Sequence, residues 1–170
     1  QHKISLQYAD PENVKFKLKQ KSDYKSSNEI NAEVKRWVAD LQEAGHLLCS
    51  ADSIRHDSLN HTVFLKVGPV YKYAFLRKGN ADPQMLASIG FSEKIYSGTV
   101  FSPKKLSRLM EKSLRWYEDH GFPFASVQLD SVKIENDKIY ASLKAERNRL
   151  IKIDSIIIQG DLKISKQFIY

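Results

Sequence analysis

One helix-and-hairpin pattern occurs twice in this sequence, and this repeat constrains the fold more than any other feature. The segment at 41–51, LQEAGHLLCSA, has the same order of apolar, polar and small residues as the segment at 117–127, YEDHGFPFASV. Their glycines, Gly45 and Gly121, lie 76 positions apart, and the same offset relates the polar turns that follow. A shared offset at separate features indicates a duplicated domain.

The second copy is predicted to be a helix followed by a β-hairpin. Ser102 is a good N-cap, Pro103 suits the first helical position, and Gly121 suits the position after the helix end. Apolar residues recur at helical spacing between them. The stretches 122–134 and 139–146 are then predicted to be strands, because a polar turn separates two runs rich in strand-forming residues.

The first copy is predicted to have the same order of elements. Its helix has Ser27 or Asn28 as the N-cap, carries an apolar face and ends at Gly45. Strands are expected at 46–54 and 62–68, with a polar turn between them. The first copy is therefore also a helix followed by a hairpin.

A further strand is predicted after each copy. The stretch 70–80 has a strand pattern ended by Gly79, and 151–161 has a similar pattern ended by Gly160. After Gly79, an Asp-Pro pair begins a short helix that stops at Gly90. One complete unit is therefore strand, short helix, long helix, strand, strand.

These elements predict an α+β fold of tandem β-α-α-β-β modules, each a three-stranded mixed sheet covered on one face by two helices. Residues 1–69 are predicted to form a divergent module and 70–149 a complete one. Residues 150–170 are predicted to hold the first strand and the start of a third module. The divergent module lacks a recognisable short helix, and its candidate first strand is KISLQYA at 3–9. We expect the polypeptide to continue beyond Tyr170, where the short helix of the third module is due.

Charge and cysteine content set limits on partners. The formal net charge is +7, from 27 basic and 20 acidic residues, and this is consistent with contact with an anionic membrane surface or an acidic partner. The densest basic cluster, at 15–21, alternates with Phe16 and Leu18, so we expect the solvated face of a strand.

Cys49 is the sole cysteine and is expected to be a small core residue. The sequence has no signal-peptide pattern and no initiator Met, which is expected of a mature exported chain or a trimmed one.

The second copy carries the signature Y-x3-G-[aromatic]-x2-A-x-V, here Tyr117, Gly121, Phe122, Ala125 and Val127. Together with the order of elements, this signature resembles the polypeptide-transport-associated (POTRA) domain of the outer-membrane barrel-assembly superfamily, which includes the bacterial surface antigens BamA and TamA. The first copy has a weaker form of the signature at Leu41, Gly45, His46, Cys49 and Ala51.

The resemblance implies a non-catalytic arm on the periplasmic side of the bacterial outer membrane. Its partners would be unfolded or extended outer-membrane protein clients, periplasmic partner proteins and its own C-terminal membrane barrel, which lies outside this sequence. The first strand of each hairpin is the expected edge strand, where an extended segment can add by β-augmentation. The partner-binding residues predicted on these edges are Ala125, Val127 and Leu129 in the second unit, and Leu48 and Ala51 in the first. The residues predicted to have structural roles are Tyr117, Gly121, Phe122, Gly45, Gly79 and Gly160.

Enzymatic and metal chemistry find little support in the sequence. His56, Asp57 and His61 are close together, but they fall on a predicted hairpin turn, where polar residues are expected. No zinc, P-loop or nucleotide-binding motif is present, so no cofactor and no metal are expected. Two alternatives to the arm reading stay open. One is a POTRA-type module of a cell-division or secretion protein without a barrel, and the other is a basic nucleic-acid-binding domain; the main reading expects no nucleic acid.

Overall fold

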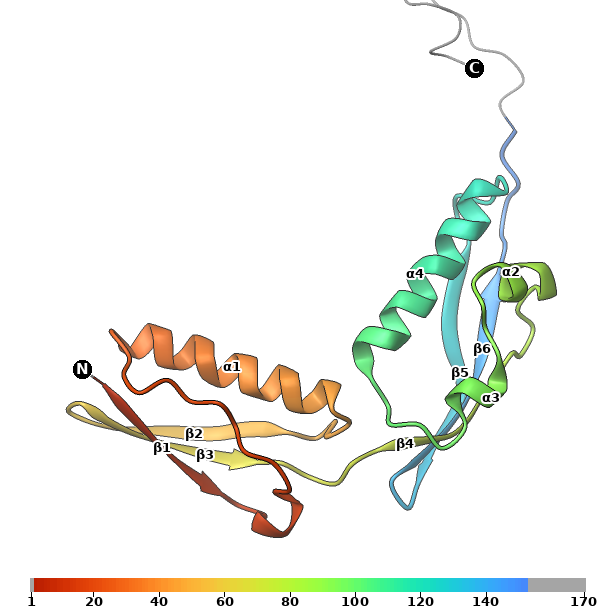
Figure 1. The fold of residues 1–170 in the computed structure, drawn as a ribbon. Helices are drawn as coiled ribbons and strands as arrows, with labels where there is room; N and C mark the ends of the chain where they lie inside the picture. The colour runs from red at the N-terminus through yellow and green to blue at the C-terminus, as the bar shows by residue number, and fades with distance from the viewer. Residues whose placement is uncertain (1, 153–170) are drawn as a thin grey trace, which may run out of the picture.

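The computed structural model describes residues 2–152, which form two three-stranded sheets with helices (Figure 1). We call the part that holds the first sheet the first unit and the part that holds the second sheet the second unit. The first unit contains β1 (Lys3–Tyr8), the 3-10 turn η1 (Pro11–Asn13), α1 (Ser27–Glu43), β2 (Ser50–Asp57) and β3 (Asn60–Lys66). The second unit contains β4 (Lys72–Arg77), α2 (Pro83–Ser88), α3 (Glu93–Tyr96), α4 (Pro103–Asp119), β5 (Ser126–Glu135) and β6 (Lys138–Glu146).

Both sheets have the same topology, which confirms the predicted fold class. The strand orders are β1-β3-β2 and β4-β6-β5, so the last strand of each unit is central. In each sheet the central strand pairs in parallel with the first strand and antiparallel with its hairpin partner. The candidate first strand of the divergent unit is therefore a real strand.

The long helices cover one face of each sheet, and their ends follow the sequence signals (Figure 1). Each has 17 residues. The α1 N-cap is Ser26, whose side chain accepts from the Glu29 backbone N–H, so the N-cap predicted at Ser27 or Asn28 was late by one or two residues. The α4 N-cap is Ser102, as predicted.

The first unit has no counterpart of α2; an extended segment covers the core instead. The prediction of a strand at 15–21 is wrong, since no strand is assigned there. The alternation it rested on is real, because Phe16 and Leu18 pack against the core while the lysines stay exposed. The segment is held by the Trp37 indole N–H, which donates to the Lys19 carbonyl at 3.1 Å.

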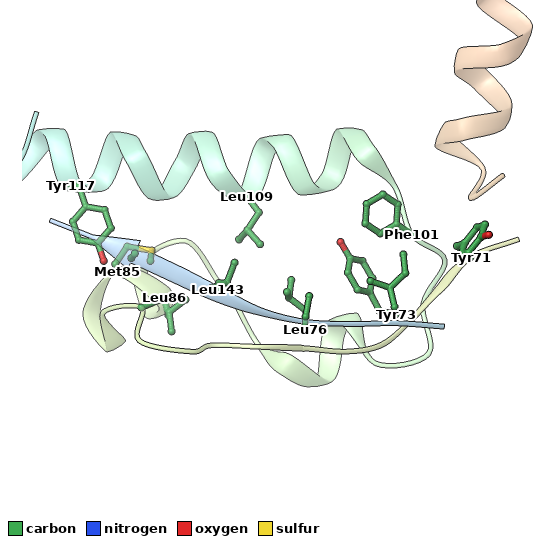
Figure 2. Packing of buried hydrophobic residues seen from close by; sticks show 13 residues of the cluster. Tyr71, Tyr73, Leu76, Met85, Leu86, Phe101, Leu109, Tyr117 and Leu143 are labelled. Carbon is green, nitrogen blue, oxygen red and sulfur yellow. The ribbon is translucent and has the colours of Figure 1, made fainter. Parts of the chain in front are cut away.

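The core of the second unit lies between α4 and its sheet (Figure 2). Leu109 and Tyr117 project from α4 toward Leu143 of β6 and the buried Met85 of α2. Of the two phenylalanines that follow α4, Phe122 packs against this core, whereas the Phe124 side chain is 64% exposed. The helix α3 was missed by the sequence analysis because a single turn has no periodicity to detect.

Both hairpins begin later than predicted, for one shared reason. After each helix-ending glycine the chain makes a tight turn before the strand begins. Cys49 N–H donates to the His46 carbonyl at 2.9 Å, and Ala125 N–H donates to the Phe122 carbonyl at 3.1 Å. The predictions that Leu48 and Ala125 lie in edge strands are therefore wrong, since the strands begin at Ser50 and Ser126.

Two predictions concern the C-terminal stretch and the membrane. The strand expected at 151–161, with Gly160, lies outside the described residues except for Ile151 and Lys152. Within residues 2–152, no helix has the length and apolar character needed to cross a bilayer.

Cys49 is buried as expected, and burial raises the pKa of its thiol to about 11.

Candidate functional site

The two edges of the second sheet, β4 and β5, are unequally open, and this difference defines the candidate site. At the beginning of β4, up to Tyr73, the backbone is closed by the segment 98–101. Tyr73 N–H donates to the Thr99 carbonyl at 2.8 Å, and Phe101 N–H donates to the Tyr71 carbonyl at 2.9 Å. Because of these bonds, the beginning of the β4 edge offers little backbone to another strand.

The β5 edge is the long open edge of the second unit. In the described part of the chain, this ten-residue strand has a single neighbour, β6. A strand with one neighbour leaves alternate N–H and C=O groups unpaired. The sequence analysis predicted this edge correctly, because a hairpin whose second strand is central leaves its first strand outside.

The side chains of β5 divide between the core and solvent. Val127 and Leu129, which were predicted to bind partners, are partly buried and pack against the core, as does Ala125 before the strand. Between them, Ser126 and Gln128 are exposed. A partner strand at this edge would therefore meet backbone and polar side chains in the first half of β5.

The second half of β5 is apolar and exposed, which the sequence analysis missed. The pairing register shifts between Asp130 and Lys133, and Ser131 has a positive φ of 53° there. Beyond this bulge, Val132 and Ile134 are 53% and 56% exposed. The sequence did show alternating apolar residues in a strand predicted to be at the edge. It did not show the bulge after which these residues are exposed.

The corresponding edge of the first unit, β2, is shorter and also irregular. Ala51 is partly buried against the core, and the register shifts between Ala51 and Ser53. Leu48, predicted to bind partners here, lies in the preceding turn and is 60% exposed. This edge is eight residues long.

Three histidines meet at the far end of the first sheet. The His61 ring is buried between His2 and His56, with nitrogen–nitrogen distances of 2.7 and 2.6 Å. Burial lowers the pKa of His61, and the neighbouring His56 and His2 lower it further. Among residues 2–152, no group of histidine, cysteine and carboxylate side chains has a geometry that would hold a metal ion.

A hollow of about 290 Å³ lies beside α4 in the second unit. Its rim on α4 is basic, with Lys105, Arg108 and Lys112, and its walls include the apolar Ile95. The Tyr73 ring lines it, but the Tyr73 hydroxyl is closed off from solvent and has no hydrogen-bond partner in the described structure. The Tyr73 hydroxyl is therefore not available to a ligand in the hollow.

The two units meet at a joint built on Gly45, the residue after α1 that has a φ of 99°. Its carbonyl accepts a hydrogen bond from Tyr71 N–H at 2.9 Å, where the chain enters β4. A Cβ on Gly45 would lie 2.5 Å from Val100 and 3.0 Å from Val70, so a side chain there would push the units apart. Leu47 also packs against the core of the second unit.

A carboxylate from the first unit completes the start of α4. Glu43, the last residue of α1, accepts from the Ser102 hydroxyl and from Lys104 N–H, the latter at 3.0 Å. The Ser102 hydrogen bond lowers the pKa of Glu43, and this effect, with help from Lys104, exceeds the opposing effect of burial. The first turn of α4 has no acidic residue of its own, so the neighbouring unit supplies the anion that suits a helix N-terminus.

Comparison with known proteins bears on the fold. No family model and no curated protein matches the chain. It is similar to the structure of POTRA3-5 of BamA from Haemophilus influenzae, with 9% identity and a TM-score of 0.58 over 97% of this chain and 73% of that one. It also matches POTRA1-2 of the periplasmic domain of Omp85 from Anabaena, with 12% identity and a TM-score of 0.49 over 89% of this chain and 96% of that one. The match to BamA shows that this chain has the fold of tandem POTRA domains, which confirms the resemblance in the sequence at the level of fold.

Proposed function

We propose that this chain is a non-catalytic interaction arm on the periplasmic side of the bacterial outer membrane, which binds extended protein segments by β-augmentation. The observation that carries the proposal is the open edge of β5, which has one neighbour along its whole length, while the beginning of the β4 edge is bonded to residues 98–101. The fold supports the setting, since the similar structures are POTRA domains of BamA and Omp85.

The chemistry of an open edge suits unfolded clients. Backbone hydrogen bonds carry no sequence code, so one edge can accept many extended segments. The exposed Val132 and Ile134 would add apolar contacts with alternate side chains of the added strand. Outer-membrane barrel precursors have strands of alternating polarity, which match such an edge.

The proposal includes a division into modules. Residues 1–69 would be the divergent module, 70–149 the complete one, and 150–170 the beginning of a third. The proposed partners are extended outer-membrane protein clients, periplasmic partner proteins, a C-terminal membrane barrel and, through the net charge of +7, an anionic membrane surface.

The test is to add a synthetic ten-residue peptide of alternating apolar and polar residues to the isotope-labelled chain. We expect slower hydrogen exchange of backbone amides in β5 and no change along β4. Ile134→Pro should weaken binding, because Ile134 pairs with Ile139, whose backbone groups face β4, so the Ile134 N–H faces the open edge and proline removes it. The matched Ile134→Val variant keeps the donor and an apolar side chain and should bind normally.

Two results would overturn the proposal. One is protection that appears away from β5 while β5 exchanges as before. The other is a folded Ile134→Pro variant that binds as tightly as the Ile134→Val variant. If the proline variant does not fold, the exchange pattern of the unmodified chain still decides.

A further inference from the structure

The C-terminal ends of the two long helices are equivalent, residue by residue. Glu43 ends α1 and Asp119 ends α4, and these acids lie 76 positions apart. Gly45 and Gly121 follow at the same offset, both with positive φ, 99° and 84°. The repeat therefore reproduces the acid and the glycine that form the joint between the units.

The backbone contact of the joint is also repeated. Tyr71 N–H donates to the Gly45 carbonyl at 2.9 Å, and Ile151 N–H donates to the Gly121 carbonyl at 2.8 Å. In both places the chain has just left the last strand of a unit, since Tyr71 follows β3 by five residues and Ile151 follows β6 by five. A Cβ on Gly121 would lie 2.9 Å from Leu150, much as one on Gly45 would lie close to Val70.

The two joints differ in what covers them. Tyr71 is 8% exposed because it packs into the second core, whereas Ile151 is 41% exposed. Leu150 is 46% exposed. Glu43 is hydrogen-bonded to α4, whereas the exposed Asp119 has no hydrogen bond or ion pair within the described residues. The second joint thus has the parts of the first without the unit that would cover them.

The position of these two acids is unfavourable for the helices that carry them. A helix C-terminus carries a partial negative charge, so a carboxylate in the last turn is repelled by its own helix. Neither α1 nor α4 has a basic residue in its last turn to offset this repulsion. For Glu43 the compensation is visible, because the carboxylate sits at the N-terminus of α4.

We infer that the end of α4 is a docking surface for a following module of the same fold, and that Asp119 accepts hydrogen bonds at the start of that module's long helix as Glu43 does at the start of α4. Asp119, Gly121, Leu150 and Ile151 form this surface. The inference rests on the proposed third module, which would begin at residue 150, and it adds the residues that fix its orientation.

The test uses the natural polypeptide continued past Tyr170. We would measure ¹⁵N relaxation of each module, which reports whether neighbouring modules tumble together. Asp119→Ala should loosen the third module and shift its docked-to-undocked ratio by about ten-fold, the size expected for loss of a helix cap. Asp119→Glu, which restores the residue type of the first joint, should keep the modules together.

Two controls separate a loss of docking from a loss of folding. Glu43→Ala should loosen the first joint and leave the second unchanged. In the 170-residue chain, Asp119→Ala should leave the thermal midpoint unchanged or raise it slightly, because the carboxylate has no hydrogen bond or ion pair among residues 2–152 and is repelled by the end of its own helix.

The outcomes are distinguishable. If no folded module follows residue 150, the third module and this inference both fail. If a module follows and tumbles with the second unit equally well in the Asp119→Ala variant, the module stands and the inference is overturned. Loosening by Asp119→Ala, with rescue by Asp119→Glu, supports it.

Discussion

The two units fasten their first strand to their last at the same place with different residues. In the first unit, the Asp10 carboxylate accepts from the N–H groups of Val67 and Gly68, at 2.8 and 2.6 Å. In the second, Asn80 both donates to and accepts from the backbone of Ala145, at 2.9 and 2.8 Å. One contact is ionised and the other is neutral, so a shared topology does not imply a shared response to pH.

The residues before these contacts also differ. Ala9 precedes Asp10, whereas Gly79 precedes Asn80. Gly79 has a φ of 55°, and a Cβ there would lie 1.8 Å from the Leu143 carbonyl oxygen. The second unit therefore brings its first strand closer to the central strand than a side chain allows, and the first unit does not.

Gly79→Ala installs the residue of the first unit in the second, and it should have the largest effect. The clash is with backbone, which cannot move aside, so we expect a loss of about 3 kcal/mol or more in the free energy of unfolding. Gly90→Ala is the matched control, because Gly90 also has a positive φ, 71°, but has open space around it. That control should lose about 1 kcal/mol. Urea unfolding of both variants measures the difference, and equal losses would show that the close approach does not matter.

Exchanging the acid and the amide tests the difference between Asp10 of the first unit and Asn80 of the second. Asp10→Asn leaves one acceptor oxygen for two N–H donors, and Asn80→Asp removes the donor to Ala145. Each change should lower the free energy of unfolding at neutral pH by about 1–2 kcal/mol. Unfolding monitored by hydrogen exchange should place the loss in the unit that was changed. A loss in the other unit would contradict the comparison.

The same exchange should alter the response to acid. Burial raises the pKa of Asp10, but the hydrogen bonds from Val67, Asn13 and Gly68 outweigh it and leave the pKa below its ordinary 3.8. The ionised carboxylate therefore stabilises the first unit fully above about pH 3.8, and this contribution is lost as the pH falls through the lowered pKa. Asp10→Asn should remove this part of the acid sensitivity.

The repeat, the topology and the open edges could be predicted from the sequence, and the contacts that join distant segments could not. Helix caps such as Ser102 and glycines such as Gly45 act on their own neighbours, so their signals are local. Asp10 is hydrogen-bonded to Val67 and Gly68, which follow it by 57 and 58 positions, and Glu43 is hydrogen-bonded to Ser102, which follows it by 59. Nothing in the local sequence marks these acids as different from solvated ones. Leu48 and Ala125 were misplaced for a related reason, because a turn of apolar residues has the composition of a strand.

A third difference is the histidine cluster, which the strands of the second sheet lack. Since burial and its neighbours lower the pKa of His61 below its ordinary 6.5, the unfolded chain binds a proton more readily there than the folded one. Stability of the first unit should therefore be full above about pH 6.5 and fall as the pH drops below it. His61→Gln should flatten this dependence. Chemical denaturation between pH 5 and 8, a range set around the ordinary histidine pKa, would measure how the free energy of unfolding depends on pH. If that dependence is the same in His61→Gln as in the unmodified chain, other groups cause it.

The smallest expected effect concerns the buried tyrosine hydroxyls. The Tyr24 hydroxyl accepts from Lys21 N–H at 3.3 Å in the first unit, whereas the Tyr73 hydroxyl has no partner in the described structure. Tyr24→Phe should lower the free energy of unfolding by about 0.5–1 kcal/mol, because it removes a hydrogen bond. Tyr73→Phe removes a buried group that has lost its contact with water and gained nothing, so stability should stay the same or rise slightly. Thermal unfolding of the two variants side by side compares them, and an equal loss in Tyr73→Phe would mean that its hydroxyl has a partner after all.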